Sequence, residues 1–183
     1  TYSGAQPGMI VKKMIEAGSS RCIMYFDELD KACSKRTSNE ITSILINLTD
    51  LCNSRCNFCD IWKIRPENEI NIPEIEDIFK SLNSNLYWLS LSGGEVTLVK
   101  YYKQMIDSLV KNCKNIKILA FTTNALAINR AVEYASYAKE KGLDVLVTIS
   151  LDGDEKTHDE LRGIKGNYNK CFDLYYKLRK KEI

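Results

Sequence analysis

Three cysteines stand close together in the segment CNSRCNFC, at Cys52, Cys56 and Cys59. Their spacing, C-x3-C-x2-C, allows three thiolates to converge on one inorganic centre. A structural zinc site would need a fourth cysteine or histidine, and the one histidine of the chain, His158, is far away in the sequence. A ferredoxin-like cluster also takes four cysteines. The remaining option is a 4Fe-4S cluster in which three irons are bound by the protein and one iron is open to a small molecule.

The other four cysteines are scattered and have apolar neighbours, which is typical of small buried hydrophobic residues. They are Cys22, Cys33, Cys113 and Cys171. An odd total of seven cysteines, three of them crowded, indicates a reducing compartment with metal-binding or catalytic thiols. We therefore expect a cytoplasmic protein.

Further polar residues follow apolar, strand-like segments. Gly93, Gly94 and Glu95 end one such segment in LSLSGGEVTL, Asn124 ends the next in FTTNA, and Ser150 lies in ISLDGDEKTHDELRG. Glycines allow a backbone to approach a ligand closely. A lone Gly-Gly-Glu is more often an ordinary turn, but here it follows the cysteines by one strand–helix unit.

Alternating strand-like and helix-like segments must position these residues. The strands are short and rich in Ile, Val and Leu, as expected for a parallel sheet covered by helices, and repeated units of this kind form right-handed βαβ crossovers. The segment before the cysteines has both a helical and an alternating pattern, and we interpret it as a strand because the cysteine loop follows at once. The predicted strands are 44–48, 86–91, 116–122 and 145–151, and the predicted helices are 73–82, 98–112, 128–141 and 168–180.

These motifs, in this order, resemble the radical S-adenosylmethionine (SAM) superfamily. Its signature is C-x3-C-x2-C with an aromatic residue before the last cysteine, here Phe58, and its Gly-Gly-Glu motif stands one βα unit later. The family usually has proline after the glutamate, where this chain has Val96. The resemblance implies an α/β fold, an incomplete (βα) barrel with four of the six βα units.

The resemblance also implies roles for individual residues. Cys52, Cys56 and Cys59 would bind the cluster, SAM would chelate the open iron, and Phe58 would lie near the adenine. Glu95 would hold the methionine ammonium group. The remaining SAM contacts would come from Gly93, Gly94, Asn124, Ser150 and Arg162, the last by pairing with the carboxylate.

Alternatives remain for two of these positions. A turn role is the alternative for Asn124, and a simple surface charge is the alternative for Arg162. His158 is expected to cap or orient its loop rather than to do chemistry. The sequence does not indicate a catalytic residue.

The chemistry implied by the resemblance is reductive cleavage of SAM to methionine and a 5′-deoxyadenosyl radical, which abstracts hydrogen from an unknown substrate. Cluster potentials span roughly −700 to +450 mV, and this reaction needs the low end. A flavodoxin- or ferredoxin-type reductant is therefore implied as a partner.

The first 43 residues resemble a different family, the ATPase module of Lon-type proteases. The segment TYSGAQPG matches a substrate-gripping pore loop through Tyr2, Ser3 and Gly4, and CIMYFDELDK matches a Walker B strand through Asp27 and Glu28. No G-x-x-x-x-G-K-[ST] phosphate loop is present in these 183 residues, so this segment cannot hydrolyse ATP alone. We expect a chimera, with residues 1–43 as a Lon-like fragment and 44–183 as the N-terminal part of a radical SAM core.

Composition sets the remaining limits. With 26 basic and 24 acidic residues the net charge is +2, which gives no footprint for nucleic acid or an anionic membrane. No apolar run approaches the roughly 20 residues that cross a bilayer.

We also expect a truncated chain with an open sheet edge after its fourth strand, and hence low turnover and a tendency to associate. The competing classes are a Lon-derived ATPase or protease fragment and a cysteine-liganded zinc or electron-transfer module.

Overall fold

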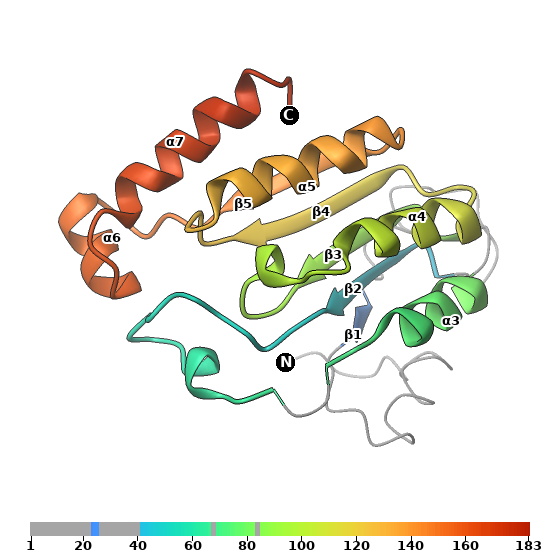
Figure 1. Ribbon diagram of the computed structural model, residues 1–183, viewed down its shortest axis with the longest axis horizontal. Helices are drawn as coiled ribbons and strands as arrows, with labels where there is room; N and C mark the ends of the chain where they lie inside the picture. Colours follow the sequence, from blue (N-terminus) through green and yellow to red (C-terminus); the bar gives the residue numbers. More distant parts are fainter. Residues whose placement is uncertain (1–22, 26–40, 67–68, 83–84) are drawn as a thin grey trace.

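The computed structural model describes residues 23–25, 41–66, 69–82 and 85–183. Their strands form one five-stranded sheet in the order β1-β2-β3-β4-β5 (Figure 1). β1 pairs with β2 antiparallel, and β2 to β5 are parallel to one another. The strands are β1 (Ile23–Tyr25), β2 (Ser43–Asn47), β3 (Trp88–Ser92), β4 (Ile118–Thr123) and β5 (Asp144–Ile149).

Helices return the chain between the parallel strands and follow the last one. The helix α3 begins with a capping box, since the Asn71 side chain accepts from the Glu74 amide and Glu74 accepts from the Asn71 amide, which satisfies two donors that the helix itself leaves unpaired. The helices are α3 (Ile72–Leu82), α4 (Tyr102–Asn112), α5 (Ile128–Glu140), α6 (Glu155–Arg162) and α7 (Asn167–Arg179), with short 3-10 turns at η1 (Ile61–Lys63) and η3 (Val96–Leu98).

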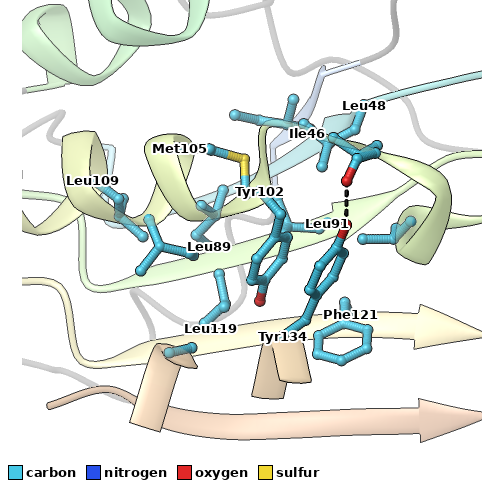
Figure 2. Close-up of a cluster of buried hydrophobic side chains, with 14 of the residues drawn as sticks. Ile46, Leu48, Leu89, Leu91, Tyr102, Met105, Leu109, Leu119, Phe121 and Tyr134 are labelled. Atoms are coloured by element: carbon cyan, nitrogen blue, oxygen red, sulfur yellow. Dashed lines mark hydrogen bonds between the residues drawn. The ribbon is translucent and has the colours of Figure 1, made fainter. Parts of the chain in front are cut away.

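The core lies between the sheet and the helices on one of its faces. Figure 2 shows Ile46, Leu89 and Leu91 of the strands packed near Tyr102 and Met105 of α4, and all five side chains are buried. Burying each large apolar side chain contributes about 1.5–3 kcal/mol. This packing fixes the helices against the strands and thereby fixes the strand ends that carry the site.

The opposite face of the sheet is less covered. Along β5, Val145, Val147 and Ile149 pack against the core, whereas Leu146 and Thr148 point away and are exposed. This alternation is typical of a strand with one face toward helices and the other toward a barrel lumen. β5 is also the last strand of the sheet that the described residues form, as expected for four βα units. The four-stranded parallel part fits a partial radical SAM barrel.

The predicted elements are confirmed with shifts of a few residues at several ends, and two predictions need correction. The helix predicted from Leu98 begins at Tyr102, because Val96–Leu98 forms a 3-10 turn in which the Glu95 side chain accepts from the Thr97 amide. The segment after β5 is not a continuous loop but contains α6. The strand interpretation of the segment before the cysteines is confirmed by β2.

Most of the Lon-like segment lies outside the described residues. This applies to Tyr2, Ser3, Gly4, Asp27 and Glu28, so their predicted roles stay predictions. Of residues 1–43, the structure describes the strand Ile23–Tyr25, at the antiparallel edge of the sheet, and residues 41–43, of which Ser43 begins β2. Over the described ranges, no helix is both long and apolar enough to cross a membrane.

Candidate functional site

One cavity lies where the four parallel strands end. Because parallel strands place their carboxyl ends at one edge of a sheet, the loops after β2, β3, β4 and β5 meet there, beside α6 (Figure 1). The cavity has a volume of about 260 Å³. All ten residues that the sequence indicated line it: Cys52, Cys56, Phe58, Cys59, Gly93, Gly94, Glu95, Asn124, Ser150 and Arg162.

The three cysteines of the loop carry free thiols. Cys56 is buried, and its sulfur lies 3.2 Å from the Ser54 hydroxyl and 3.7 Å from Arg162 Nη1. The Asn124 side-chain amide lies 3.9 Å from the sulfur of Cys52, and burial raises the pKa of the Cys52 thiol. Donors directed at two of the three sulfurs would stabilise thiolate charge.

This donor set fits an iron–sulfur cluster. Cysteine thiolates hold such clusters, and hydrogen bonds to the sulfurs are one of the features that set their potential. Within the described ranges, no three His, Cys, Asp or Glu side chains come together closely enough to hold one metal ion. The three thiols instead share the wall of the cavity.

The cysteine loop is attached to the end of α6. The Arg55 amide donates to the Arg162 carbonyl at 3.1 Å, and the Asn57 amide donates to the Leu161 carbonyl at 3.0 Å. The Ser54 hydroxyl also donates to the Arg162 carbonyl, at 3.2 Å. These bonds satisfy carbonyls that a helix end leaves unpaired, and they hold the loop between Cys52 and Cys59 in place.

Besides lining the cavity, the two glycines pack closely against another part of the backbone. A Cβ on Gly93, whose φ is +145°, would lie 2.4 Å from the Thr49 carbonyl oxygen, and one on Gly94 would lie 2.3 Å from the Leu51 carbonyl oxygen. The amides of Gly94 and Glu95 donate to these same two carbonyls, at 2.7 and 2.8 Å. The backbone that they approach is therefore the base of the cysteine loop, which leaves no room for side chains here.

Glu95 is almost completely buried and accepts four hydrogen bonds. Oε1 accepts from the Thr97 amide, the Thr97 hydroxyl and the Thr123 hydroxyl, and Oε2 accepts from the Asn124 amide at 2.7 Å. A carboxylate has about four acceptor positions, two per oxygen, so Oε2 keeps capacity for one further donor. The carboxylate ties the loops after β3 and β4 together and still offers one position to a ligand.

Asn124 joins the β4 loop to the cysteine loop. Its side-chain amide donates to the Asn53 side chain at 2.8 Å, while its Oδ1 accepts from the Leu126 amide two residues on. The second bond is that of an Asx turn, so the turn role considered for Asn124 is present together with its place in the cavity. Ser150 is half-buried, and its amide donates to the Thr123 carbonyl at 3.0 Å.

Arg162 has a partner that the sequence did not indicate. Its Nε donates to Asp152 Oδ2, and the guanidinium lies 5.4 Å from the centre of the Phe58 ring. Partial burial disfavours the charged guanidinium, and the contact with Asp152 outweighs this effect and raises the pKa of Arg162. Arg162 is therefore a fixed cation in the cavity wall.

His158 orients this loop, as expected. Its fully buried ring accepts from the Asp152 amide at 3.1 Å through Nδ1, and Nε2 lies 3.3 Å from the Asn167 side-chain oxygen. The side-chain amide of Asn167 (Nδ2) in turn donates to the Asn124 carbonyl at 2.8 Å. Asn167 gave no signal in the sequence, because an isolated asparagine at a helix start is usually a cap.

Comparison with known proteins gives two separate similarities. The family model of the Radical SAM superfamily matches residues 46–183. A Lon protease homolog from Acanthamoeba polyphaga mimivirus is 52% identical over 60 residues, which cover 33% of this chain and 6% of that protein. This second match falls on a short N-terminal stretch, as expected from the pore-loop and Walker B resemblance.

The relatives of the larger segment are enzymes or maturation proteins. The chain is 33% identical to the GTP 3′,8-cyclase of Alkaliphilus oremlandii over 149 residues. This match covers 75% of this chain and 45% of the cyclase. It is 29% identical to the sporulation killing factor maturation protein SkfB of Bacillus subtilis over 143 residues. This match covers 77% of this chain and 33% of that protein. The chain thus spans less than half the length of these relatives. The family match covers most of the chain, and the chain belongs to the radical SAM superfamily, whose enzymes use a 4Fe-4S cluster and S-adenosylmethionine.

Proposed function

We propose that this chain binds a 4Fe-4S cluster through Cys52, Cys56 and Cys59, binds SAM beside it, and is part of an enzyme that cleaves SAM reductively. The observation that supports this proposal most strongly is the common cavity, which is lined by the three thiols and by the motif residues of the other three strand ends. Family membership supports the same chemistry. The substrate is left open, because the relatives' names point to different substrates.

Different residues of the chain would bind the cluster and SAM. The cysteines supply thiolates, and Arg162 Nη1, 3.7 Å from the Cys56 sulfur, stabilises the charge on Cys56. Oε2 of Glu95 has the acceptor position that an ammonium group needs, and the guanidinium of Arg162 has the donors that a carboxylate needs. Phe58 is 59% exposed and offers an aromatic face to the adenine.

When bound, the cluster supplies one electron for breaking the S–C5′ bond of SAM, which gives methionine and a 5′-deoxyadenosyl radical able to abstract hydrogen. The chain's own part is to hold the two reactants in register and to set the charge around them. A flavodoxin- or ferredoxin-type protein supplies the electron. Such a cluster requires reducing surroundings, so we place the protein in the cytoplasm.

We further propose a boundary near residue 43. Residues 1–43 derive from the ATPase module of a Lon-type protease, and residues 44–183 are the N-terminal part of a radical SAM core. The Lon match over an N-terminal stretch and the Radical SAM match over 46–183 support two separate origins. The Lon match is 60 residues long and therefore extends beyond residue 43, so the position of the boundary rests on the start of the Radical SAM match.

Anaerobic reconstitution with iron and sulfide tests the cluster. We expect a brown protein with about four irons and four sulfides per chain, whose reduced electron paramagnetic resonance spectrum changes when SAM is added. Cys56→Ala should lose the chromophore, because it removes one of three ligands. Cys113→Ala is the matched control, since Cys113 is fully buried in the hydrophobic core.

Three results would contradict the proposal. Iron and sulfide contents that are equal in Cys56→Ala and in the unchanged protein would remove the cysteine loop as the cluster site. Bound zinc without inorganic sulfide would favour a plain zinc module, and a spectrum that is identical with and without SAM would favour simple electron transfer.

A further inference from the structure

The outer side of the cysteine loop carries an exposed cluster of cations. Between Cys52 and Pro66 the basic residues are Arg55, Lys63 and Arg65, and all three are exposed. The one acid in this stretch, Asp60, pairs with Lys63 at 2.7 Å. The fifteen residues 52–66 therefore have a net charge of +2, and Glu67 and Glu69 follow them in the sequence.

A tryptophan lies at the centre of this cluster. The Trp62 ring has the guanidinium carbon of Arg55 at 5.0 Å and the ammonium of Lys63 at 5.2 Å from its centre. Its indole Nε1 donates to the carbonyl of Cys56 at 3.1 Å. Trp62 is half-buried and also lines the cavity, so it connects the cationic surface with the backbone of a cluster ligand.

Further contacts hold Arg55 and Lys63 in place. Arg55 Nη1 donates to the Ser54 carbonyl at 3.0 Å, and the backbone of Arg55 is bound to the end of α6. Lys63 belongs to the short helix η1, in the turquoise loop at the lower left of Figure 1. Cations that are held in position lose less freedom on binding a partner than free side chains would.

From these contacts we propose that Arg55 and Lys63, which lie over Trp62, form together with the exposed Arg65 the docking surface for an acidic, low-potential electron-transfer protein. The inference rests on the proposed function, because it presumes a cluster held by the cysteine loop. On docking, the reduced cofactor of the partner loses one electron and the bound cluster gains one electron. No proton or chemical group is transferred.

Charge and distance both support this occupant. A basic surface attracts an acidic protein, steers it and raises its rate of association at low ionic strength. The aromatic ring at the centre offers the kind of residue that anchors protein interfaces. A partner that contacts Trp62 is separated from the Cys56 backbone by one side chain. This short path favours electron transfer to the cluster through this surface.

The test compares two variants with the same change in net charge. Lys63→Glu with Arg65→Glu reverses two charges on the proposed surface. Lys111→Glu with Lys114→Glu reverses two exposed charges at the C-terminal end of α4, on the side where β4 begins and away from the cysteine loop (Figure 1). None of these side chains lines the cavity. Iron content and unfolding curves establish that both proteins remain folded and loaded.

Binding of a purified, acidic bacterial flavodoxin is measured by calorimetry from about 20 to 300 mM salt. We expect the Lys63→Glu/Arg65→Glu protein to bind at least about tenfold more weakly at low salt, with the difference shrinking as salt screens the charges. The control protein should bind as the unchanged protein does. Reduction of the cluster by reduced flavodoxin should slow in parallel with binding.

Sodium dithionite separates this inference from the proposed function, because a small reductant needs no docking surface. If dithionite supports SAM cleavage equally in all three proteins and only flavodoxin discriminates among them, the docking surface is supported. If flavodoxin binds all three equally, or the two variants lose affinity equally, the docking surface is wrong and the proposed function stands. If no cluster forms in the unchanged protein, both proposals are overturned.

Discussion

Replacing Gly163 by alanine should destabilise the fold and empty the cluster site together. Gly163 ends α6 with a φ of +65°, and a Cβ there would lie 2.5 Å from the Arg55 carbonyl oxygen and 2.9 Å from the Arg55 Cβ. The first contact is with backbone and cannot be relieved by rotating a side chain. The cysteine loop would have to move away from the end of α6.

The size of the effect follows from two contributions. Holding alanine at a positive φ costs about 1–2 kcal/mol. Moving the loop weakens three hydrogen bonds, from the Arg55 amide, the Asn57 amide and the Ser54 hydroxyl to the end of α6, and each contributes roughly 0.5–1.5 kcal/mol. We expect Gly163→Ala to lower the free energy of unfolding by about 2.5–6.5 kcal/mol.

Gly166→Ala is the matched control. Gly166 has a φ of +79°, yet no atom lies within 4 Å of the position of its Cβ. This variant should therefore show only the backbone cost of about 1–2 kcal/mol. Urea unfolding measures both stabilities, and iron per chain after anaerobic reconstitution measures the site.

The comparison of the two variants decides the outcome. Gly163→Ala should hold less than half of the iron of the unchanged protein, and Gly166→Ala should hold nearly all of it. Equal losses of stability and equal iron contents in both variants would refute the reasoning, because the contact between α6 and the cysteine loop would then contribute nothing.

Three further predictions concern single buried or paired groups. Glu95→Gln should lower the unfolding free energy by about 1.5–3 kcal/mol, measured in urea, because its amide NH₂ would face one of the four donors that now surround the carboxylate. Asp152→Asn removes the charge that holds Arg162 and should weaken SAM binding several-fold in calorimetry without loss of iron. Burial raises the pKa of Cys113 from 9.0 to about 11, so the folded state keeps a proton that the unfolded chain releases. Stability should thus fall between pH 9 and 11, less steeply in Cys113→Ala, as followed by thermal unfolding at each pH.

Much of the site could be predicted because a parallel α/β sheet obeys a simple rule. Once 44–48, 86–91, 116–122 and 145–151 are read as consecutive parallel strands, the residues after them must meet at one edge. Cys52, Glu95, Asn124 and Ser150 do line one cavity. Local patterns also located helix ends, as at Gly142, whose φ of +85° follows α5.

Other features gave no local signal. The helix α6 has eight residues, of which only His158 is buried, so it lacks the apolar periodicity by which a helix is detected. Asp152 could not be distinguished from an ordinary loop carboxylate, because its partner Arg162 is ten residues away and is fixed by α6. The start of α4 was misplaced for a related reason, since Val96–Leu98 is capped by Glu95 and forms a 3-10 turn.

The sequence by itself determined the family, the order of the strands and helices and the identity of the candidate ligands, because these depend on spacing and alternation along the chain. Only the tertiary structure decided why glycine is needed at positions 93, 94 and 163, that is, Gly93, Gly94 and Gly163. Each lies against the backbone of the segment from Thr49 to Arg55, at distances that a Cβ would not permit. Such contacts join parts of the chain that are about 40 to 110 residues apart, and no local pattern encodes them, because excluded volume acts between atoms that only the fold brings together.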